Sequence, residues 1–378
     1  MPRSGKAGAD WTRFRIHVRM TCMRWEDLRE GRDADALFGV EDIAPVPDRG
    51  TGRAGLASPG AGPVSGGDGE PVAVEIRARS IINRVPGESP MFRWTLNPYR
   101  GCAHACVYCF ARRSHTYLDL DAGRDFDTKI LVKVNAGELL RAELARPSWG
   151  GEPIAMGTNT DPYQRAEGRY RLMPQIISAL AEAANPFSVL TKGRLVLRDA
   201  DLLEQAARTT DVRLAVSVGT VDGPLAGSVE PGAPTPRARL DTVRALADRG
   251  LGCSVLMAPV LPGLTDSPEA IDAAVAAIAE AGASSVTPIV LHLRPGGARE
   301  WYASWLAREH PHLVPLYREL YGDGSYAPAP YRELIAARVR EAARRYGIGG
   351  RGGASGRRAH RQRDGAATVR APRQLRLL

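Results

Sequence analysis

The residues from Arg100 to Phe110 read RGCAHACVYCF, and the rest of the chain is arranged around this stretch. Cys102, Cys106 and Cys109 stand in a C-x3-C-x2-C spacing, and no other pair among the five cysteines lies so close in the sequence. Thiolates are the ligands that iron–sulfur clusters and zinc select. Three cysteines on one short loop therefore predict a soft metal centre.

Two metal centres fit this spacing. Structural zinc requires four ligands, and His104 and His115 are the local candidates for the fourth. A [4Fe-4S] cluster held by three cysteines instead leaves one iron open, which is useful for chemistry rather than for scaffolding. The spacing favours the cluster and keeps zinc as the alternative.

The cysteine motif, with the aromatic Tyr108 directly before the third cysteine, resembles the signature of radical S-adenosylmethionine (SAM) enzymes. Three later blocks resemble the spore photoproduct lyase-like branch of that superfamily, often labelled DNA repair photolyases. These blocks are GTNTDPYQ at Gly157–Gln164, LTKG at Leu190–Gly193 and the run Glu230–Leu240, and the resemblance spans residues 76–346. It implies an enzyme in which a [4Fe-4S] cluster on the three cysteines cleaves SAM reductively. The resulting 5′-deoxyadenosyl radical then abstracts a substrate hydrogen.

The resemblance also implies a set of residues that bind SAM. They are Tyr108, Thr158, Asn159, Thr160, Asp161, Lys192, Ser217, Glu230 and Arg239. In the family the aromatic residue lies against the adenine, the lysine reaches the cofactor carboxylate and the serine binds the ribose. Simple packing over the cluster is the alternative for Tyr108. For Asp161, which precedes a proline, the alternative is turn formation.

Glu230 and Arg239 flank the segment EPGAPTPRARL, which in relatives orders the loop over the cofactor. The two side chains either form a buried ion pair or are solvated. Gly150–Pro153 reads GGEP and resembles the superfamily motif that binds the cofactor's amino group. That motif belongs after a strand, whereas this copy precedes one. We therefore expect the TNTD segment, which follows the strand, to take its place.

Cys253 is a candidate hydrogen-atom donor. Spore photoproduct lyases proper use a cysteine located just before the segment equivalent to Asp161, but residues 153–161 contain none here. Cys253 opens another expected strand and could approach the site. Its alternative role is that of a small core residue.

Short apolar runs alternate with longer amphipathic runs after residue 92. We expect strands at 92–96, 130–134, 153–157, 187–191, 212–218, 253–260 and 286–293, and helices at 136–145, 173–184, 199–208, 236–249 and 268–281. Alternating strand–helix units imply an α/β fold with a parallel sheet and right-handed crossovers. The resemblance implies the incomplete (β/α)6 TIM-like barrel of radical SAM enzymes. Chemistry in such barrels lies at the carboxyl ends of the strands, where the cysteine loop and the later blocks all fall.

Composition divides the chain into four parts. We expect an N-terminal extension with a Gly/Pro-rich linker, the barrel, a C-terminal helical cap and a disordered Arg/Gly-rich tail, at residues 1–71, 72–296, 297–348 and 349–378. The cap carries four aromatic residues at helix-like spacing, Trp301, Trp305, Tyr317 and Tyr321. They are expected to pack on the barrel. The alternative is that some of them line the substrate cleft and stack on a base.

Charge and composition constrain the partners. The net charge is +9, but residues 349–378 carry +7 and residues 1–22 carry +4, so the body is close to neutral. The tail could bind nucleic acid non-specifically or could simply be solvated. A zinc-stabilised nucleic-acid-binding protein is the non-enzymatic alternative. The enzyme interpretation requires a ferredoxin- or flavodoxin-type electron donor, with a nucleic acid as one candidate substrate.

The remaining composition is that of an ordinary globular protein. No apolar run approaches the ~20 residues of a membrane helix, and the N-terminus carries no apolar segment typical of a secretory signal. Clustered cysteines suit a reducing compartment. We expect a cytoplasmic protein.

Overall fold

The computed structural model describes residues 43–44, 71–85 and 92–348. The predicted Arg/Gly-rich tail lies outside these residues, as does nearly all of the predicted N-terminal extension and linker. The longer described part of the chain begins with β2 (Val72–Ala78), which starts where the sequence predicts the enzyme to begin.

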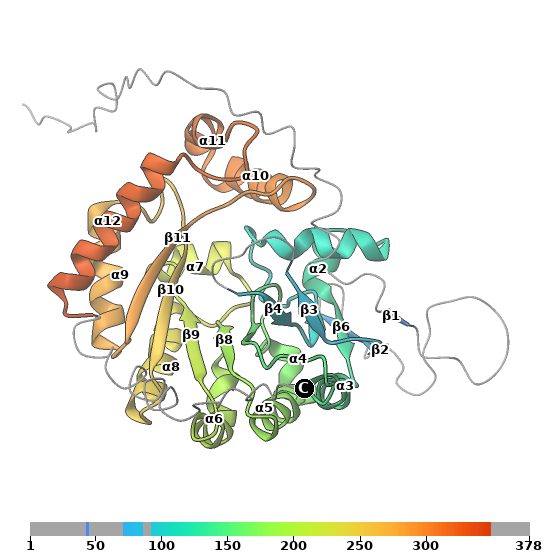
Figure 1. Ribbon diagram of the computed structural model, residues 1–378. Helices are drawn as coiled ribbons and strands as arrows, with labels where there is room; N and C mark the ends of the chain where they lie inside the picture. The colour runs from blue at the N-terminus through green and yellow to red at the C-terminus, as the bar shows by residue number, and fades with distance from the viewer. Residues whose placement is uncertain (1–42, 45–70, 86–91, 349–378) are drawn as a thin grey trace, which may run out of the picture.

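A seven-stranded sheet forms the centre of the protein (Figure 1). In spatial order its strands are β11 (Ser285–Val290), β10 (Cys253–Val260), β9 (Val212–Ser217), β8 (Phe187–Thr191), β7 (Ile154–Met156), β4 (Trp94–Leu96) and β3 (Ile82–Arg84). All neighbours from β4 to β11 are parallel, and β3 pairs antiparallel with β4. The sheet is open, with β3 and β11 at its edges, and the predicted α/β class with a parallel sheet is confirmed.

Helices connect the parallel strands and cover the outer side of the sheet (Figure 1). They are α3 (Ala136–Leu144), α4 (Arg165–Tyr170), α5 (Leu172–Glu182), α6 (Ala200–Ala207), α8 (Pro236–Asp248) and α9 (Pro268–Glu280). The short helix α7 (Gly223–Val229) instead lies on the inner side, where the carbonyl of its last residue accepts the N–H of Val107 at 3.0 Å. Helices α8 and α9 both begin with proline after a capping side chain. Thr235 accepts the N–H of Ala238 at 3.3 Å, and Ser267 accepts the N–H of Ala270 at 3.1 Å. These caps satisfy amide groups that would otherwise have no partner within the helix.

One predicted strand belongs to a different sheet. The expected strand at 130–134 is β6 (Lys129–Lys133), which lies between β2 and β5 (Tyr99–Arg100) in a four-stranded sheet completed by β1 (Ile43–Ala44). β2 supplies a full parallel partner for β6, from Val72 opposite Lys129 to Ile76 opposite Lys133. In the main sheet β4 instead pairs directly with β7. The expectation that the strand at 130–134 belongs to the main parallel sheet is therefore wrong.

Two short helical segments follow the cysteine loop, namely the 3-10 helix η3 (Phe110–Leu118) and α2 (Arg124–Thr128). A further 3-10 segment, η4 (Arg194–Asp199), leads into α6. Helical structure thus begins at Phe110, directly after the third cysteine.

The C-terminal segment is helical, with α10 (Ala298–Glu309), η5 (Pro311–Leu313), α11 (Val314–Tyr321) and α12 (Ala329–Arg345). Trp305, Tyr317 and Tyr321 are buried, as expected for a cap that packs on the body. Trp305 Nε1 donates to Ser228 Oγ at 3.0 Å, and the Tyr321 hydroxyl donates to the Leu291 carbonyl at 2.6 Å. Among the described residues, no helix combines the length and the apolar character needed to cross a membrane.

Candidate active site

The carboxyl ends of neighbouring strands carry most of the predicted site residues. β7 leads into the turn at 158–161, β8 leads into Lys192, β9 ends at Ser217 and β10 ends at Val260. The carboxyl ends of parallel strands lie at one edge of a sheet, where ligands of α/β folds bind. The cysteine loop follows β5 and contacts the same turn, so the structure brings these segments together.

The cysteine loop is a compact turn held by its own backbone. The N–H of Ala105 donates to the carbonyl of Cys102 at 3.1 Å, and the N–H of Cys109 donates to the carbonyl of Cys106 at 3.2 Å. Gly101 takes a φ of +77°, and a Cβ at this position would clash with two backbone oxygens. Glycine is therefore required immediately before the first cysteine.

The three thiols are shielded from water and close enough to influence one another. Burial is the largest cause that raises the pKa of Cys106 to about 12, and it also raises the pKa of Cys102 and of Cys109. Lys192 acts in the opposite direction on the pKa of both Cys106 and Cys109. Thiolates at these positions would therefore be stabilised by bound cationic iron, which compensates the loss of water.

The surroundings of the loop fit a cluster better than a zinc ion. Both histidine candidates face other partners. His104 Nδ1 lies 3.5 Å from Asp161 Oδ2, and His115 Nε2 donates to the Lys129 carbonyl at 2.9 Å. A four-iron cluster is larger than an ion, so its three thiolates need not converge on one point.

Asp161 joins the turn after β7 to the end of β8. Its carboxylate accepts the Thr191 hydroxyl at 2.6 Å, the N–H of Lys192 at 2.6 Å and the N–H of Tyr163 at 2.9 Å. A carboxylate with three donors is firmly oriented. The described contacts give Asp161 a positioning role toward Lys192, while direct contact with the cofactor stays a prediction.

Thr160 and Asn159 in the same turn differ in whether their side chains have hydrogen-bond partners. Thr160 is buried and donates to the carbonyl of Tyr99 at 2.9 Å, which fixes the turn against β5. Asn159 Oδ1 is shielded from solvent and has no hydrogen-bond partner among the described residues. An unpaired buried acceptor costs stability unless a ligand donates to it. Asn159 is therefore the member of the turn that best fits an amino group, while Thr158 is half-buried beside it.

A group of two buried and two half-buried side chains stands beside the cysteine loop. Glu230 accepts hydrogen bonds from the Tyr108 hydroxyl and from Arg239, one on each carboxylate oxygen. Lys192 Nζ lies 3.8 Å from the same carboxylate and 5.8 Å from the centre of the Tyr108 ring. The ion pair expected between Glu230 and Arg239 is present, and both side chains are buried. We call these four residues the charged network.

The charged network keeps its ionic members charged despite their burial. Burial disfavours the charged form of Lys192, but Cys106 and Glu230 outweigh that effect and raise its pKa. Burial would also raise the pKa of Glu230, but Lys192 and Arg239 outweigh it and lower that pKa. The positively charged side chain of Lys192 is thus held near Cys106, the second cysteine of the loop.

Ser217 closes the site on the side of β9. Its hydroxyl donates to the Ala258 carbonyl at 3.0 Å, and its own carbonyl accepts from Arg239 Nη1 at 3.2 Å. Arg239 Nε also donates to the Pro234 carbonyl at 2.7 Å. The predicted ribose-binding serine therefore adjoins the charged network.

Cys253 lies at the other end of its strand. It is the first residue of β10, opposite Leu214 of β9, whereas Ala258 near the carboxyl end of β10 contacts Ser217. Its thiol is fully buried, with the Ser254 carbonyl 3.5 Å away, and burial raises its pKa to about 12. Five residues of strand correspond to roughly 16 Å. The structure thus does not bring Cys253 together with the other predicted residues.

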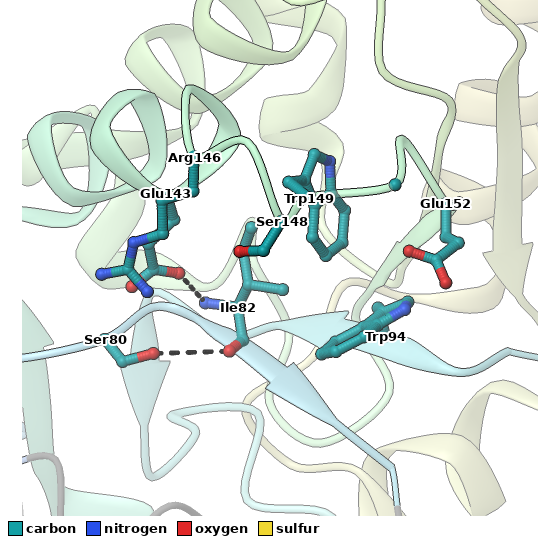
Figure 2. A pocket seen from close by; sticks show the side chains of 9 residues that line it. Ser80, Ile82, Trp94, Glu143, Arg146, Ser148, Trp149 and Glu152 are labelled. Atoms are coloured by element: carbon teal, nitrogen blue, oxygen red, sulfur yellow. Dashed lines mark hydrogen bonds between the residues drawn. The ribbon is translucent and has the colours of Figure 1, made fainter.

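A cavity of about 310 Å3 lies beside the amino end of β4 (Figure 2). The charged network instead lies at the carboxyl ends of the strands. Trp94, the first residue of β4, and Trp149 meet edge to face there, with ring centres 5.2 Å apart. Glu152 of the GGEP segment stands beside them (Figure 2). This segment precedes β7, so it lies at the amino ends of the strands, as the sequence order indicates.

Two residues that hold the cysteine loop were not among the sequence predictions. Gln164 accepts the N–H of Ala103 and donates to the Gly101 carbonyl, both at 3.0 Å. Its position at the end of GTNTDPYQ was the available signal. Arg112 is fully buried and donates twice to the Cys106 carbonyl. The sequence shows it only as the first of two adjacent arginines, so nothing singled it out.

Gly232 packs directly on the cysteine loop. Its N–H donates to the His104 carbonyl at 3.1 Å, and a Cβ would lie 1.9 Å from the Ala103 carbonyl oxygen. Gly232→Ala is therefore expected to displace the loop and to lower the free energy of unfolding by about 1–3 kcal/mol. Urea denaturation and iron content after reconstitution measure both effects.

The matched control for this prediction is Gly227→Ala in α7, where a Cβ would meet no atom within 4 Å. Alanine is the better helix former, so the control should be as stable as the wild type or slightly more stable. Equal iron content and stability in the two variants would show that the contact with Ala103 is unimportant.

The chain is similar to several known proteins. The model of the radical SAM superfamily matches residues 96–275. An uncharacterized protein of Mycobacterium tuberculosis is 52% identical over 277 residues, covering 73% of this chain and 81% of the relative. An uncharacterized protein of Methanocaldococcus jannaschii is 27% identical over 193 residues, covering 51% of this chain and 69% of the relative.

Solved structures extend the likeness to the fold. Spore photoproduct lyase complexed with dinucleoside spore photoproduct superimposes with a TM-score of 0.56 at 16% identity, over 73% of this chain and 80% of that chain. A mutant of the same enzyme with bound AdoMet and dinucleoside spore photoproduct gives 0.54 at 16% identity, over 69% and 76%. The chain belongs to the radical SAM superfamily and is an enzyme, with a fold similar to that of spore photoproduct lyase.

Proposed function

We propose that the chain holds a [4Fe-4S] cluster on Cys102, Cys106 and Cys109 and uses it to cleave SAM within a partial (β/α)6 barrel. The observation that carries this proposal is the position of the charged network, which presents the largely shielded cation of Lys192 next to a loop of two buried thiols and one half-buried thiol. When bound, the cluster supplies the single electron that splits SAM into methionine and a 5′-deoxyadenosyl radical.

The chain's own residues bind and orient the cofactor. Lys192 offers its ammonium group to the carboxylate of the methionine part, and Asn159 Oδ1 accepts from its amino group. Ser217 stands on the ribose side. Glu230 keeps Lys192 charged and fixes the Tyr108 ring by accepting a hydrogen bond from its hydroxyl group. Because these groups are buried, water is excluded from the place where a radical would be quenched.

Substrate and partners follow from the same proposal. We propose a ferredoxin- or flavodoxin-type electron donor and a cytoplasmic enzyme. The solved structures with the similar fold contain a dinucleoside photoproduct, and a nucleic acid is the corresponding substrate proposed for this chain. The absence of cysteine from residues 153–161 and the remote place of Cys253 favour a repair or modification reaction that does not depend on a cysteine donor there.

Anaerobic reconstitution tests this function. The protein should turn brown with iron and sulfide, and dithionite should then yield 5′-deoxyadenosine from SAM. Cys106→Ala should lose both colour and product because it removes a cluster ligand, whereas Cys253→Ala should retain both. A colourless protein that binds zinc and forms no 5′-deoxyadenosine would support the zinc-stabilised nucleic-acid-binding alternative.

A further inference from the structure

Three aromatic rings run outward from the cysteine loop. Phe110 directly follows Cys109, and its ring centre lies 5.3 Å from that of His292. The His292 ring in turn lies 5.7 Å from that of Tyr326, which is 52% exposed. An antiparallel backbone bridge between His292 and Tyr326 fixes the outer two rings. We call these three residues the aromatic strip.

The aromatic strip lies at an open edge of the main sheet. His292 follows β11, which has no strand beyond it among the described residues. A cavity of about 210 Å3 adjoins the strip and is lined by Pro288, Ile289, Val290, His292, Tyr326, Arg332 and Ile335. Pockets that enclose a whole drug-sized ligand have roughly 300–1,000 Å3. This cavity therefore suits one part of a longer ligand that continues along the surface.

Three arginines surround the strip without carboxylate partners. The Arg294 guanidinium lies 5.6 Å from the centre of the Phe110 ring, and Arg332 lines the cavity. Arg113 packs against Gly296, two residues beyond Arg294, where a Cβ would lie 3.4 Å from its Cδ. Within residues 71–85 and 92–348, none of the three forms an ion pair.

The middle ring is uncharged at neutral pH. Burial, followed by the nearby Arg294, lowers the pKa of His292 to about 4. A neutral imidazole offers a flat face in the same way as its phenyl and phenol neighbours. The surface thus combines flat rings with unpaired cations, which are the two features that proteins use to bind single strands.

We infer that the aromatic strip, with Arg113, Arg294 and Arg332, binds a single-stranded segment of nucleic acid and leads one nucleotide to the cysteine loop. The inference rests on the proposed function, because the inner end of the strip is the residue next to the third cysteine. Bases stack on the rings, and phosphates pair with the arginines. The buried aromatic residues of the cap, Trp305, Tyr317 and Tyr321, are unavailable for this role.

Photocrosslinking and binding measurements on the full-length reconstituted protein test the inference. An oligonucleotide carrying 5-iodouracil should crosslink to the peptides that contain Tyr326, His292 or Phe110. In fluorescence anisotropy with a short labelled oligothymidylate, Tyr326→Ala should weaken binding about tenfold or more, while Tyr326→Phe should bind like the wild type. Arg332→Gln should reduce the salt slope by about one. A matched oligouridylate shows whether DNA or RNA is preferred.

Matched controls lie at the other end of α12. Tyr346→Ala removes another exposed tyrosine, 38% exposed against 52% for Tyr326, and Arg340→Gln removes an exposed arginine, so both should bind like the wild type. Crosslinks confined to other peptides, or equal affinity of Tyr326→Ala and Tyr346→Ala, would overturn the inference. Formation of 5′-deoxyadenosine without oligonucleotide is measured on the same preparations. If 5′-deoxyadenosine forms while Tyr326→Ala binds like the wild type, the inference about the aromatic strip is wrong and the proposed function stands. If Tyr326→Ala weakens binding but no 5′-deoxyadenosine forms, the strip binds nucleic acid and the proposed function is wrong.

Discussion

Replacing Glu230 by glutamine is expected to lower the free energy of unfolding by about 3–5 kcal/mol and to abolish 5′-deoxyadenosine formation. The carboxylate is 5% exposed and faces Arg239, which is 2% exposed, and Lys192, which is 16% exposed. Removing one charge from such a group leaves the remaining cations without compensation in a site shielded from water. Glutamine keeps only one acceptor oxygen, so either Tyr108 or Arg239 would also lose its hydrogen-bond acceptor, and the lysine and the ring over the cysteine loop would become more mobile.

The pH dependence of stability separates this effect from simple loss of packing. Lys192 and Arg239 hold the pKa of Glu230 below its ordinary value of 4.5. A carboxyl group with a lowered pKa in the folded state contributes stability above its unfolded pKa, and that contribution is lost as the pH falls through the folded pKa. The wild type should therefore lose this contribution only below about pH 4.5. The variant lacks it at every pH, so the difference between the two proteins should shrink in acid.

Glu182→Gln is the matched control for this measurement. Glu182 also pairs with an arginine, Arg141, but their side chains are 60% and 46% exposed. Exposed pairs contribute little, so this variant should unfold like the wild type. Equal stability of the two glutamine variants at pH 7 would refute the importance of the charged network.

Regular patterns made much of the fold predictable. β8 and β10 begin and end at the predicted residues, because their apolar side chains alternate and their flanking turns are short. The sheet to which β6 belongs could not be predicted, because a short apolar strand has the same sequence pattern in either sheet. Only the pairing of β2 with β6 decides it, and that depends on residues more than fifty positions apart.

The site was predictable where spacing or resemblance carried it. The three cysteines share one loop, and the residues after β7, β8 and β9 meet because parallel strands end at one edge. Asp161 shows the limit of such a prediction. An aspartate that contacts a cofactor and an aspartate that orients Lys192 cannot be told apart from the sequence motif. Cys253 shows another limit. It lies far from the site because it is the first residue of β10, and the residue type alone does not reveal where that strand begins.

Arg112→Met is expected to destabilise the protein by about 3–5 kcal/mol and to reduce iron incorporation. The guanidinium is fully buried between the rings of Phe126 and Trp301, at 5.3 Å and 4.8 Å from their centres. It donates to the Cys106 carbonyl at 3.2 and 2.9 Å and to Asp127 at 2.9 and 3.0 Å. Methionine fills a similar space but removes both Arg112 bonds from the Cys106 carbonyl, which keeps only the N–H of Cys109, and leaves the Asp127 carboxylate unpaired.

A double variant separates the two consequences of losing Arg112. Adding Asp127→Leu removes the unpaired carboxylate, and replacing both members of a buried pair by apolar residues is often neutral. Much of the lost stability should therefore return, whereas iron content should stay low because the Cys106 carbonyl still lacks both Arg112 donors. The control Arg124→Met changes an exposed arginine of α2 and should alter neither quantity. Full iron content in the double variant would show that Arg112 stabilises the fold without positioning the second cysteine.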